Sequence, residues 1–170
     1  MEFEKVLKER YSVRRYQEKE IEPNKLTKIL EAGINAPSAK NMQPQRIYVL
    51  KSKEALEKIK SITKCTYGAP LVLLGCFDKN QSWKNNLSGE DAGVEDVSIA
   101  CTQIMLAAWN EGIGSCWVNM YDSKLIKKEF ALPDNIIPVC LMPMGYIAPE
   151  AKPIPMHFAK KDFSEIFTEI

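Results

Sequence analysis

The fold is decided by one strongly apolar stretch, Val94-Glu95-Asp96-Val97-Ser98-Ile99-Ala100-Cys101-Thr102-Gln103-Ile104-Met105-Leu106-Ala107-Ala108-Trp109. Its apolar residues recur at a spacing of three and four, the period of an α-helix, and further apolar residues fill much of the opposite side. A helix that is apolar nearly all round is buried inside a domain or against a partner. We therefore expect a central hydrophobic helix, which a capping box at Ser88 to Asp91 opens and which Gly112 ends.

Shorter segments on both sides of this stretch predict the other helices and strands. Helical spacing and helix-start signals indicate helices over residues 2–10, from Pro23 to about 36, from a Ser52 cap to 62, and from Asp122 or Ser123 to 130. Short apolar runs indicate strands over residues 47–50, 70–77, 113–118 and 137–144. Strands do not alternate regularly with helices, so we expect an α+β fold: a mixed, mainly antiparallel sheet flanked by helices on both faces.

Length and composition favour a single globular domain over residues 1–170. Hydrophobic residues make up 45% of the chain and charged residues 26%, with no internal repeat or long linker. The 23 basic and 22 acidic residues give a net charge of +1, which leaves no electrostatic footprint for nucleic acid or an anionic membrane. No apolar run approaches the roughly 18 residues that span a bilayer, and residues 1–5 lack the apolar stretch of a signal peptide. We expect neither a nucleic-acid nor a membrane partner.

Cysteine and histidine usage favours a cytoplasmic protein without a metal site. The five cysteines, at positions 65, 76, 101, 116 and 140, include no Cys-x-x-Cys pair. We expect buried free thiols in a reducing compartment rather than a disulfide framework. The chain has one histidine, His157, so a histidine-based metal site is not expected.

The tail over residues 148–170 is expected to pack on another surface. After three prolines it carries an apolar-patterned end: Phe158, Phe163, Ile166, Phe167 and Ile170. A segment so apolar at the end of a chain is expected to pack on its own domain or on a second subunit.

A basic segment follows the first predicted helix: Arg10-Tyr11-Ser12-Val13-Arg14-Arg15-Tyr16. In an extended conformation Arg10, Ser12 and Arg14 share one face. Two guanidinium groups beside a hydroxyl suit a phosphate or a carboxylate, because arginine donates to such groups in a bidentate fork. Taken alone, the segment also fits a solvated basic stretch, which is the simpler interpretation.

A second segment, Ala36-Pro37-Ser38-Ala39-Lys40-Asn41-Met42-Gln43-Pro44, has two prolines around several hydrogen-bonding side chains. Such a rigid loop can present Ser38, Asn41 and Gln43 to the polar edge of a ligand. Taken alone, the segment is better interpreted as a plain turn between a helix and a strand.

A third segment is Glu111-Gly112-Ile113-Gly114-Ser115-Cys116-Trp117-Val118-Asn119. The order of helix then strand and the missing third glycine exclude a dinucleotide-binding fingerprint. No histidine lies in a general-base context, so we expect Cys116 to be a buried thiol rather than a nucleophile. Trp117 could stack on a ring or belong to the core, and both interpretations stay open.

The order and spacing of these motifs resemble the nitroreductase (flavin reductase) family. The pattern also includes Asp96 at the start of the apolar helix, Gln103 and Leu106-Ala107-Ala108 further along it, and Met144-Gly145-Tyr146. The resemblance runs from about residue 3 to about residue 165 of this chain. It implies a homodimer that binds FMN in two clefts between the subunits, and an enzyme in which the flavin carries the chemistry without a catalytic side chain.

The resemblance also implies which residues bind FMN. One subunit would supply Arg10, Tyr11, Ser12 and Arg14, with Arg10 and Ser12 at the phosphate and ribityl end and Arg14 at the pyrimidine edge. The other subunit would supply Pro37, Ser38, Asn41 and Gln43. The segment Trp117-Val118-Asn119-Met120 would lie against the ring, with a backbone N–H near flavin N5. Lys160, or the adjacent Lys161, would complete the phosphate site.

The implied reaction is hydride transfer from NADH or NADPH to flavin N5, and then to a nitroaromatic, quinone or flavin-like acceptor by a ping-pong mechanism. Three departures from the family pattern bear on it: Gln45 where many relatives carry tryptophan, Asn119-Met120 in place of a Glu-Gly pair, and a short Asp78–Glu90 region. Alternatives are a different reaction in the same fold, such as dehalogenation or flavin fragmentation, and a dimer without catalytic activity, with or without bound flavin.

Overall fold

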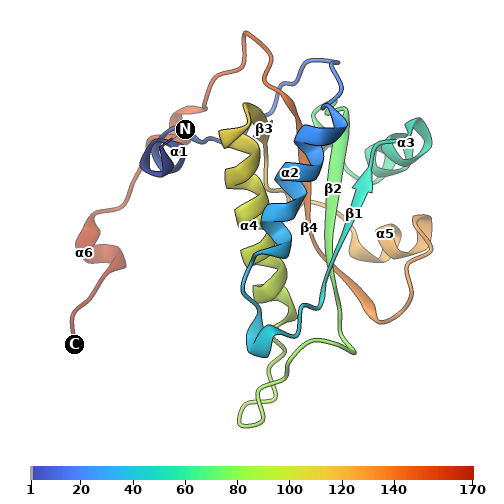
Figure 1. The fold of residues 1–170 in the computed structure, drawn as a ribbon, viewed down its shortest axis with the longest axis vertical. Helices are drawn as coiled ribbons and strands as arrows, with labels where there is room; N and C mark the ends of the chain where they lie inside the picture. Colours follow the sequence, from blue (N-terminus) through green and yellow to red (C-terminus); the bar gives the residue numbers. More distant parts are fainter. Residues whose placement is uncertain (1) are drawn as a thin grey trace.

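A four-stranded antiparallel sheet forms the centre of the computed structural model, which describes residues 2–170 (Figure 1). The strands are β1 (Gln45–Leu50), β2 (Leu71–Asp78), β3 (Ile113–Ser115) and β4 (Ile136–Tyr146), in the order β1-β2-β4-β3. The expected α+β fold is confirmed. The named strands all pair antiparallel, so the parallel component of the expected mixed sheet is reduced to an isolated bridge between Ser12 and Ser115.

Helices cover both faces of the sheet (Figure 1). On one face lie α2 (Pro23–Ile34) and α4 (Gly93–Asn110), and on the other lie α3 (Lys53–Ile62) and α5 (Ser123–Glu129). Side chains of β2 alternate between the two layers: Leu71 and Leu73 pack in the cluster with α4, whereas Val72 and Leu74 pack in the cluster with α3 and α5. Because both faces are covered, β2 reads as a continuous apolar run.

The central helix α4 lies where the apolar pattern predicts it, and Gly112, with φ of 75°, follows its end. The predicted capping box is wrong. The helix begins two residues after Asp91, whose carboxylate accepts the N–H of Gly93 at 2.8 Å. Ser88 instead lies in a turn and donates its hydroxyl to Glu90 at 3.0 Å, so it is too far from the helix start to cap it.

The third predicted strand is shorter than residues 113–118. It ends at Ser115, and the next residue pairs with Pro143 of β4, whose carbonyl accepts the N–H of Cys116 at 3.2 Å. Because proline has no backbone N–H, Pro143 donates no hydrogen bond in return, and the ladder between β3 and β4 ends there. Val118 meets β4 again only as an isolated bridge to Leu141, with N–H···O distances of 2.9 and 3.0 Å.

A polar cluster ties the end of β4 to the start of α2. The Tyr146 hydroxyl donates to Glu22, and Lys19 Nζ lies 3.0 Å from Glu22 Oε1 and 4.1 Å from the centre of the Tyr146 ring. The hydrogen bond from Tyr146, a bond to the Glu22 backbone and the bond from Lys19 lower the pKa of Glu22 from 4.5 to about 2.

Glu22→Gln is expected to remove a pH-dependent contribution to stability. Because the pKa of Glu22 is lowered by folding, the stabilisation is full above pH 4.5 and is lost as the pH falls through about 2. Urea unfolding of both proteins should show a stability difference that is constant near pH 6 and shrinks toward zero at pH 2. Glu20→Gln is the control, since this neighbouring carboxylate is exposed. A difference that persists at pH 2 would contradict the assignment.

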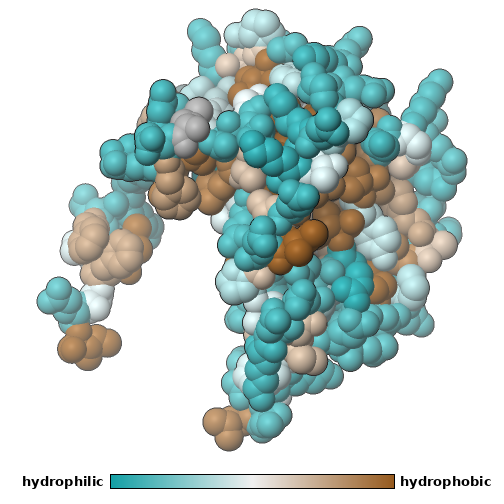
Figure 2. Space-filling view, in the orientation of Figure 1, coloured by the Kyte–Doolittle hydropathy of each residue, from teal (hydrophilic) through white to brown (hydrophobic). Residues whose placement is uncertain are grey.

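The tail does not bury its apolar residues within the subunit. It holds only a short 3₁₀ turn (Pro155–His157) and the single-turn helix α6 (Phe163–Ile166), and it runs away from the domain (Figures 1 and 2). Its apolar side chains remain 59–121% exposed: Phe158, Phe163, Ile166, Phe167 and Ile170. Phe163 and Phe167 touch each other, with ring centres 4.6 Å apart. Of the two expected packing surfaces, the tail's own domain therefore covers little of it.

The five cysteines are free and buried, as expected. Over residues 2–170, none of the helices is long and apolar enough to cross a membrane. The short helix α1 (Phe3–Glu9) precedes the basic segment and lies against α4.

Candidate functional site

The basic segment after α1 is extended and lies along the edge strand β3. Tyr11 and Val13 point inward and are buried, whereas Ser12 and Arg14 are partly exposed on the other side, as the alternation predicts. The N–H of Val13 donates to the carbonyl of Ser115 at 2.9 Å, which fixes the segment against the sheet. Burial of the inward residues therefore positions the two polar ones.

Ser12 and Arg14 line a cavity of about 210 Å³, whose opposite wall is the first part of the tail, Pro153 to His157. Arg14 donates one hydrogen bond to the carbonyl of Ser12 at 3.2 Å, and its guanidinium lies 6.0 Å from the centre of the Tyr67 ring. Tyr11 also lines the cavity, but its ring packs on Trp109 and its hydroxyl donates to Ala151 at 3.3 Å. The remaining guanidinium donors of Arg14 can bind an anionic or carbonyl group.

Cys116 lies beside this cavity and is buried, with 2% of its surface exposed. Burial raises the pKa of its thiol, and the nearby Arg14 and Ser12 offset the increase only in part. A neutral buried thiol is unreactive, which agrees with the prediction from the sequence.

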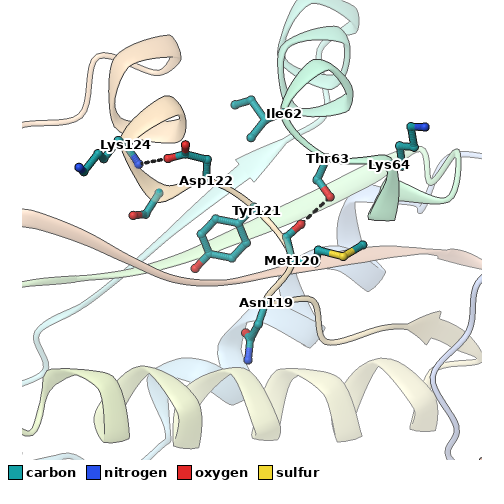
Figure 3. A pocket seen from close by; sticks show the side chains of 9 residues that line it. Ile62, Thr63, Lys64, Asn119, Met120, Tyr121, Asp122 and Lys124 are labelled. Atoms are coloured by element: carbon teal, nitrogen blue, oxygen red, sulfur yellow. Dashed lines mark hydrogen bonds between the residues drawn. The ribbon is translucent and has the colours of Figure 1, made fainter.

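The segment over residues 117–120, which follows β3, presents backbone N–H donors without an acceptor in the described part of the protein. The indole of Trp117 donates to Asn119 Oδ1 at 2.9 Å. The Thr63 hydroxyl donates to the Met120 carbonyl at 2.6 Å (Figure 3). Within residues 2–170, the backbone N–H groups of Asn119 and Met120 donate to no protein group. Both residues line an open hollow of about 850 Å³ between the end of α3 and the start of α5 (Figure 3). This segment can therefore donate hydrogen bonds to a ligand.

The loop between α2 and β1 is rigid and strained. Lys40, Asn41 and Gln43 adopt positive φ values of 48°, 55° and 49°, in the left-handed region that side chains disfavour. The Ser38 hydroxyl accepts the N–H of Gln43 at 3.0 Å and closes the loop. Strained residues gathered in one loop are typical of ligand sites, where the surrounding structure holds them in place.

Asp96 anchors this loop, and sequence reasoning missed it as a site residue. Its side chain, in the first turn of α4, is 2% exposed, and Oδ1 accepts the N–H of Ala39 at 2.8 Å. Oδ2 is buried without a partner among residues 2–170. The available signal was a carboxylate on an otherwise apolar, buried helix face, since such a group needs a specific partner.

Asp96→Ala is expected to speed trypsin cleavage after Lys40 about tenfold, because loss of the acceptor leaves the loop N–H unsatisfied at a cost of about 1–3 kcal/mol. Asp96→Asn keeps an acceptor at the same place and should stay near the wild-type rate. Glu95→Ala is the control, because Glu95 is exposed on the same helical turn. Timed digestion followed by mass spectrometry measures the rates, and equal rates in wild type and Asp96→Ala would reject the anchoring role.

The basic segment and the loop between α2 and β1 lie at opposite ends of α4 (Figure 1). The basic segment packs near Trp109 at the carboxyl end, through the ring of Tyr11, with ring centres 5.4 Å apart. The loop of Pro37, Ser38, Asn41 and Gln43 lies at the amino end, held by Asp96. Asp96 and Trp109 are 13 residues apart, or about 20 Å along a helix with a rise of 1.5 Å per residue. One chain therefore does not bring the groups together.

Lys160 and Lys161 lie apart from both groups, in the exposed part of the tail. Lys161 pairs with Glu165 at 3.7 Å, within the tail. Arg10, the first residue of the basic segment, lies at the end of α1. Trp117 is partly buried and packs against the core on the α4 side, so its core role is observed.

Comparison with known proteins gives a consistent result. Residues 7–67 and 63–146 match the model of the nitroreductase family. A relative from Methanothermobacter thermautotrophicus, described as a candidate NADH dehydrogenase/NAD(P)H nitroreductase, is 32% identical over 157 residues, which covers 87% of this chain and 78% of the relative.

Two solved structures from Clostridium difficile are similar over nearly the whole chain. A nitroreductase family protein superposes with a TM-score of 0.91 at 36% identity, covering 99% of this chain and 98% of the other. An FMN-dependent nitroreductase superposes with a TM-score of 0.76 at 30% identity, covering 96% of each chain. The chain therefore belongs to the nitroreductase family.

Proposed function

We propose that the protein is an FMN-dependent NAD(P)H oxidoreductase that works as a homodimer, with FMN bound in two sites shared between the subunits. The observation that carries the proposal is the placement of two ligand-binding groups about 20 Å apart on one chain, at opposite ends of α4. A two-fold axis that pairs two copies of α4 antiparallel would place the loop of one subunit beside the basic segment of the other. The FMN-dependent relative at 30% identity supports the choice of cofactor.

The residues present fit FMN. Ser12 and Arg14 line a cavity with a hydroxyl and a guanidinium group, both of which can bind a phosphate or a carbonyl oxygen. The backbone N–H groups of Asn119 and Met120, which donate to no other group of residues 2–170, suit acceptor atoms on a flavin ring. Arg10 and a tail lysine, Lys160 or Lys161, would bind the phosphate dianion through charge-assisted hydrogen bonds. The rigid loop with Pro37, Ser38, Asn41 and Gln43 would contact the flavin from the second subunit.

Bound FMN would supply the redox chemistry, taking hydride from NADH or NADPH and passing it to a small acceptor such as a nitroaromatic compound, a quinone or a free flavin. Arg14 at the pyrimidine edge would stabilise negative charge there and raise the reduction potential. The N–H groups of Asn119 and Met120 would orient the ring. The buried, neutral Cys116 takes no part in the reaction.

The exposed apolar tail supports the homodimer. Its five large apolar side chains are accessible in the single chain, and their burial against a second copy would stabilise a dimer. The buried free thiols fit the reducing conditions of the cytoplasm, which we propose as the location.

The test is spectroscopic and hydrodynamic. Purified protein should be yellow or become yellow on dialysis against FMN, and should bind one FMN per subunit as a dimer at micromolar concentration. Added NADH or NADPH should bleach the flavin band, and a nitroaromatic or quinone should restore it. A protein that stays colourless after dialysis, or that is monomeric in light scattering while it binds FMN, would overturn the shared-site proposal.

A further inference from the structure

A basic hollow of about 560 Å³ lies beside the strained loop, and none of the functions above uses it. The segment over residues 79–86, which follows β2, forms its second wall, and both walls lie at the amino end of α4 (Figure 1). Three lysines line it, Lys40, Lys79 and Lys84, and among residues 2–170 no carboxylate lines it. None of the three makes an ion pair with another described residue. Three unpaired ammonium groups around one hollow produce a local positive potential on a chain whose net charge is only +1.

An aromatic ring completes the hollow. Trp83 lines it half-buried, and Lys40 Nζ lies 5.7 Å from the centre of the indole. Asn80 and Asn86 add side-chain amides that can donate or accept hydrogen bonds. A ligand that matches this lining carries several negative charges and a flat ring.

Both walls of the hollow are held in place. The carbonyl of Trp83 accepts the N–H of Ala92 at 3.0 Å, and the Ser82 hydroxyl donates to Asp91 at 2.8 Å. Lys84 and Asp91 form an antiparallel bridge, so the 79–91 segment is folded back on itself. On the other wall, Lys40 is held at a φ of 48° by the same loop that Asp96 anchors. Strain held at a lysine that lines a hollow is typical of a binding position.

We propose that this hollow binds the pyrophosphate and adenosine part of the pyridine dinucleotide that donates hydride. The inference rests on the proposed function, in which Ser38, Asn41 and Gln43 of the same loop contact FMN. Lys40 and Met42 alternate with Asn41 and Gln43 and line the hollow, so a dinucleotide held there lies next to the flavin. The lysines bind the phosphates and the indole stacks on the adenine ring. NADPH carries one more phosphate than NADH, so the lysines favour NADPH.

The experiment uses the FMN-loaded dimer and compares three hydride donors. NADPH and NADH carry phosphates and adenine, whereas 1-benzyl-1,4-dihydronicotinamide carries the same reactive ring without either. In the triple variant Lys40→Gln, Lys79→Gln, Lys84→Gln, the KM for NADPH should rise at least tenfold, and the KM for NADH should rise less. The limiting rate of flavin reduction, the KM for the benzyl donor and the affinity for FMN should not change.

A matched control removes the same charge elsewhere. Lys51, Lys53 and Lys60 are exposed around α3, far along the sheet from the hollow, and their triple change to glutamine should leave every KM within about twofold of wild type. A second variant, Trp83→Ala, should raise the KM for both dinucleotides about fivefold, and Trp83→Phe should restore most of the loss.

Each remaining outcome decides against the assignment. If NADPH reduces the wild type and the KM for NADPH is unchanged in the triple variant, the assignment of the hollow is wrong, but the proposed function stands. A parallel rise for the benzyl donor would assign the lysines to the reactive end of the site, and a weakened affinity for FMN would assign them to the flavin phosphate. A wild type that none of the donors reduces would overturn the proposed function itself, and this assignment with it.

Discussion

Replacing Arg14 with alanine is expected to weaken FMN binding about 10- to 100-fold. A hydrogen bond from a charged side chain contributes about 1.5–3 kcal/mol, and each 1.4 kcal/mol is a factor of ten in affinity. Arg14 donates one hydrogen bond to the Ser12 carbonyl, at 3.2 Å, and its side chain lines the cavity. Titration of the apoprotein with FMN, followed by the quenching of flavin fluorescence, measures the dissociation constant.

The neighbouring Arg15 provides a matched control for Arg14. Arg15 is exposed, and its backbone carbonyl, which accepts the N–H of Ala148 at 3.2 Å, survives the change to alanine. Arg15→Ala removes the same charge and should bind FMN as wild type does. Arg14→Lys should fall between wild type and Arg14→Ala, because it keeps the charge but loses the planar fork. Equal dissociation constants for Arg14→Ala and Arg15→Ala would remove Arg14 from the flavin site.

Adding charge to the tail is expected to split the dimer. Phe163 and Phe167 are 76% and 59% exposed in the single chain, and burial of each ring against a partner would contribute about 1.5–3 kcal/mol. The double variant Phe163→Asp, Phe167→Asp should therefore raise the dimer dissociation constant at least 100-fold, which is about 2.7 kcal/mol. Sedimentation velocity across a range of concentrations measures that constant.

The tail variant separates assembly from folding. Because the two rings touch each other rather than the domain, the subunit's far-UV circular dichroism should not change. Bound FMN should be lost together with the dimer, since each site needs two subunits. Thr168→Asp, in the same exposed part of the tail, should leave the dimer intact. A dimer as tight as wild type in the double variant would show that the tail is not part of the interface.

Much of the architecture could be predicted from local patterns. The apolar period of α4 and the continuous apolar run of β2 reflect burial on both faces of the sheet, and the side chains of Ser52 and Asp122 cap α3 and α5 as expected. The capping box was predicted wrongly because the chain turns before α4 begins. In that turn the N–H of Asn85 donates to the carbonyl of Glu90, and the N–H of Gly89 donates to the carbonyl of Asn85. Local spacing does not reveal such a turn.

The candidate site was less accessible to sequence reasoning, because it depends on contacts between distant segments. The roles of Asp96 and of the three left-handed residues arise where α4 meets the loop after α2, 57 residues apart in the chain at the Ala39–Asp96 bond. The shortening of β3 depends on Pro143, which lies on its partner strand. Family resemblance supplied the list of residues, but their division between two ends of α4 became visible only in the structure.

That division has a genetic consequence. A subunit carrying Arg14→Ala is damaged at one end of α4, and a subunit carrying Asp96→Ala is damaged at the other. A mixed dimer of the two would contain one site built from both undamaged ends and one site built from both damaged ends. Two alleles that each damage both shared sites when expressed alone should then complement each other when co-expressed, whereas two alleles that alter the same end should not.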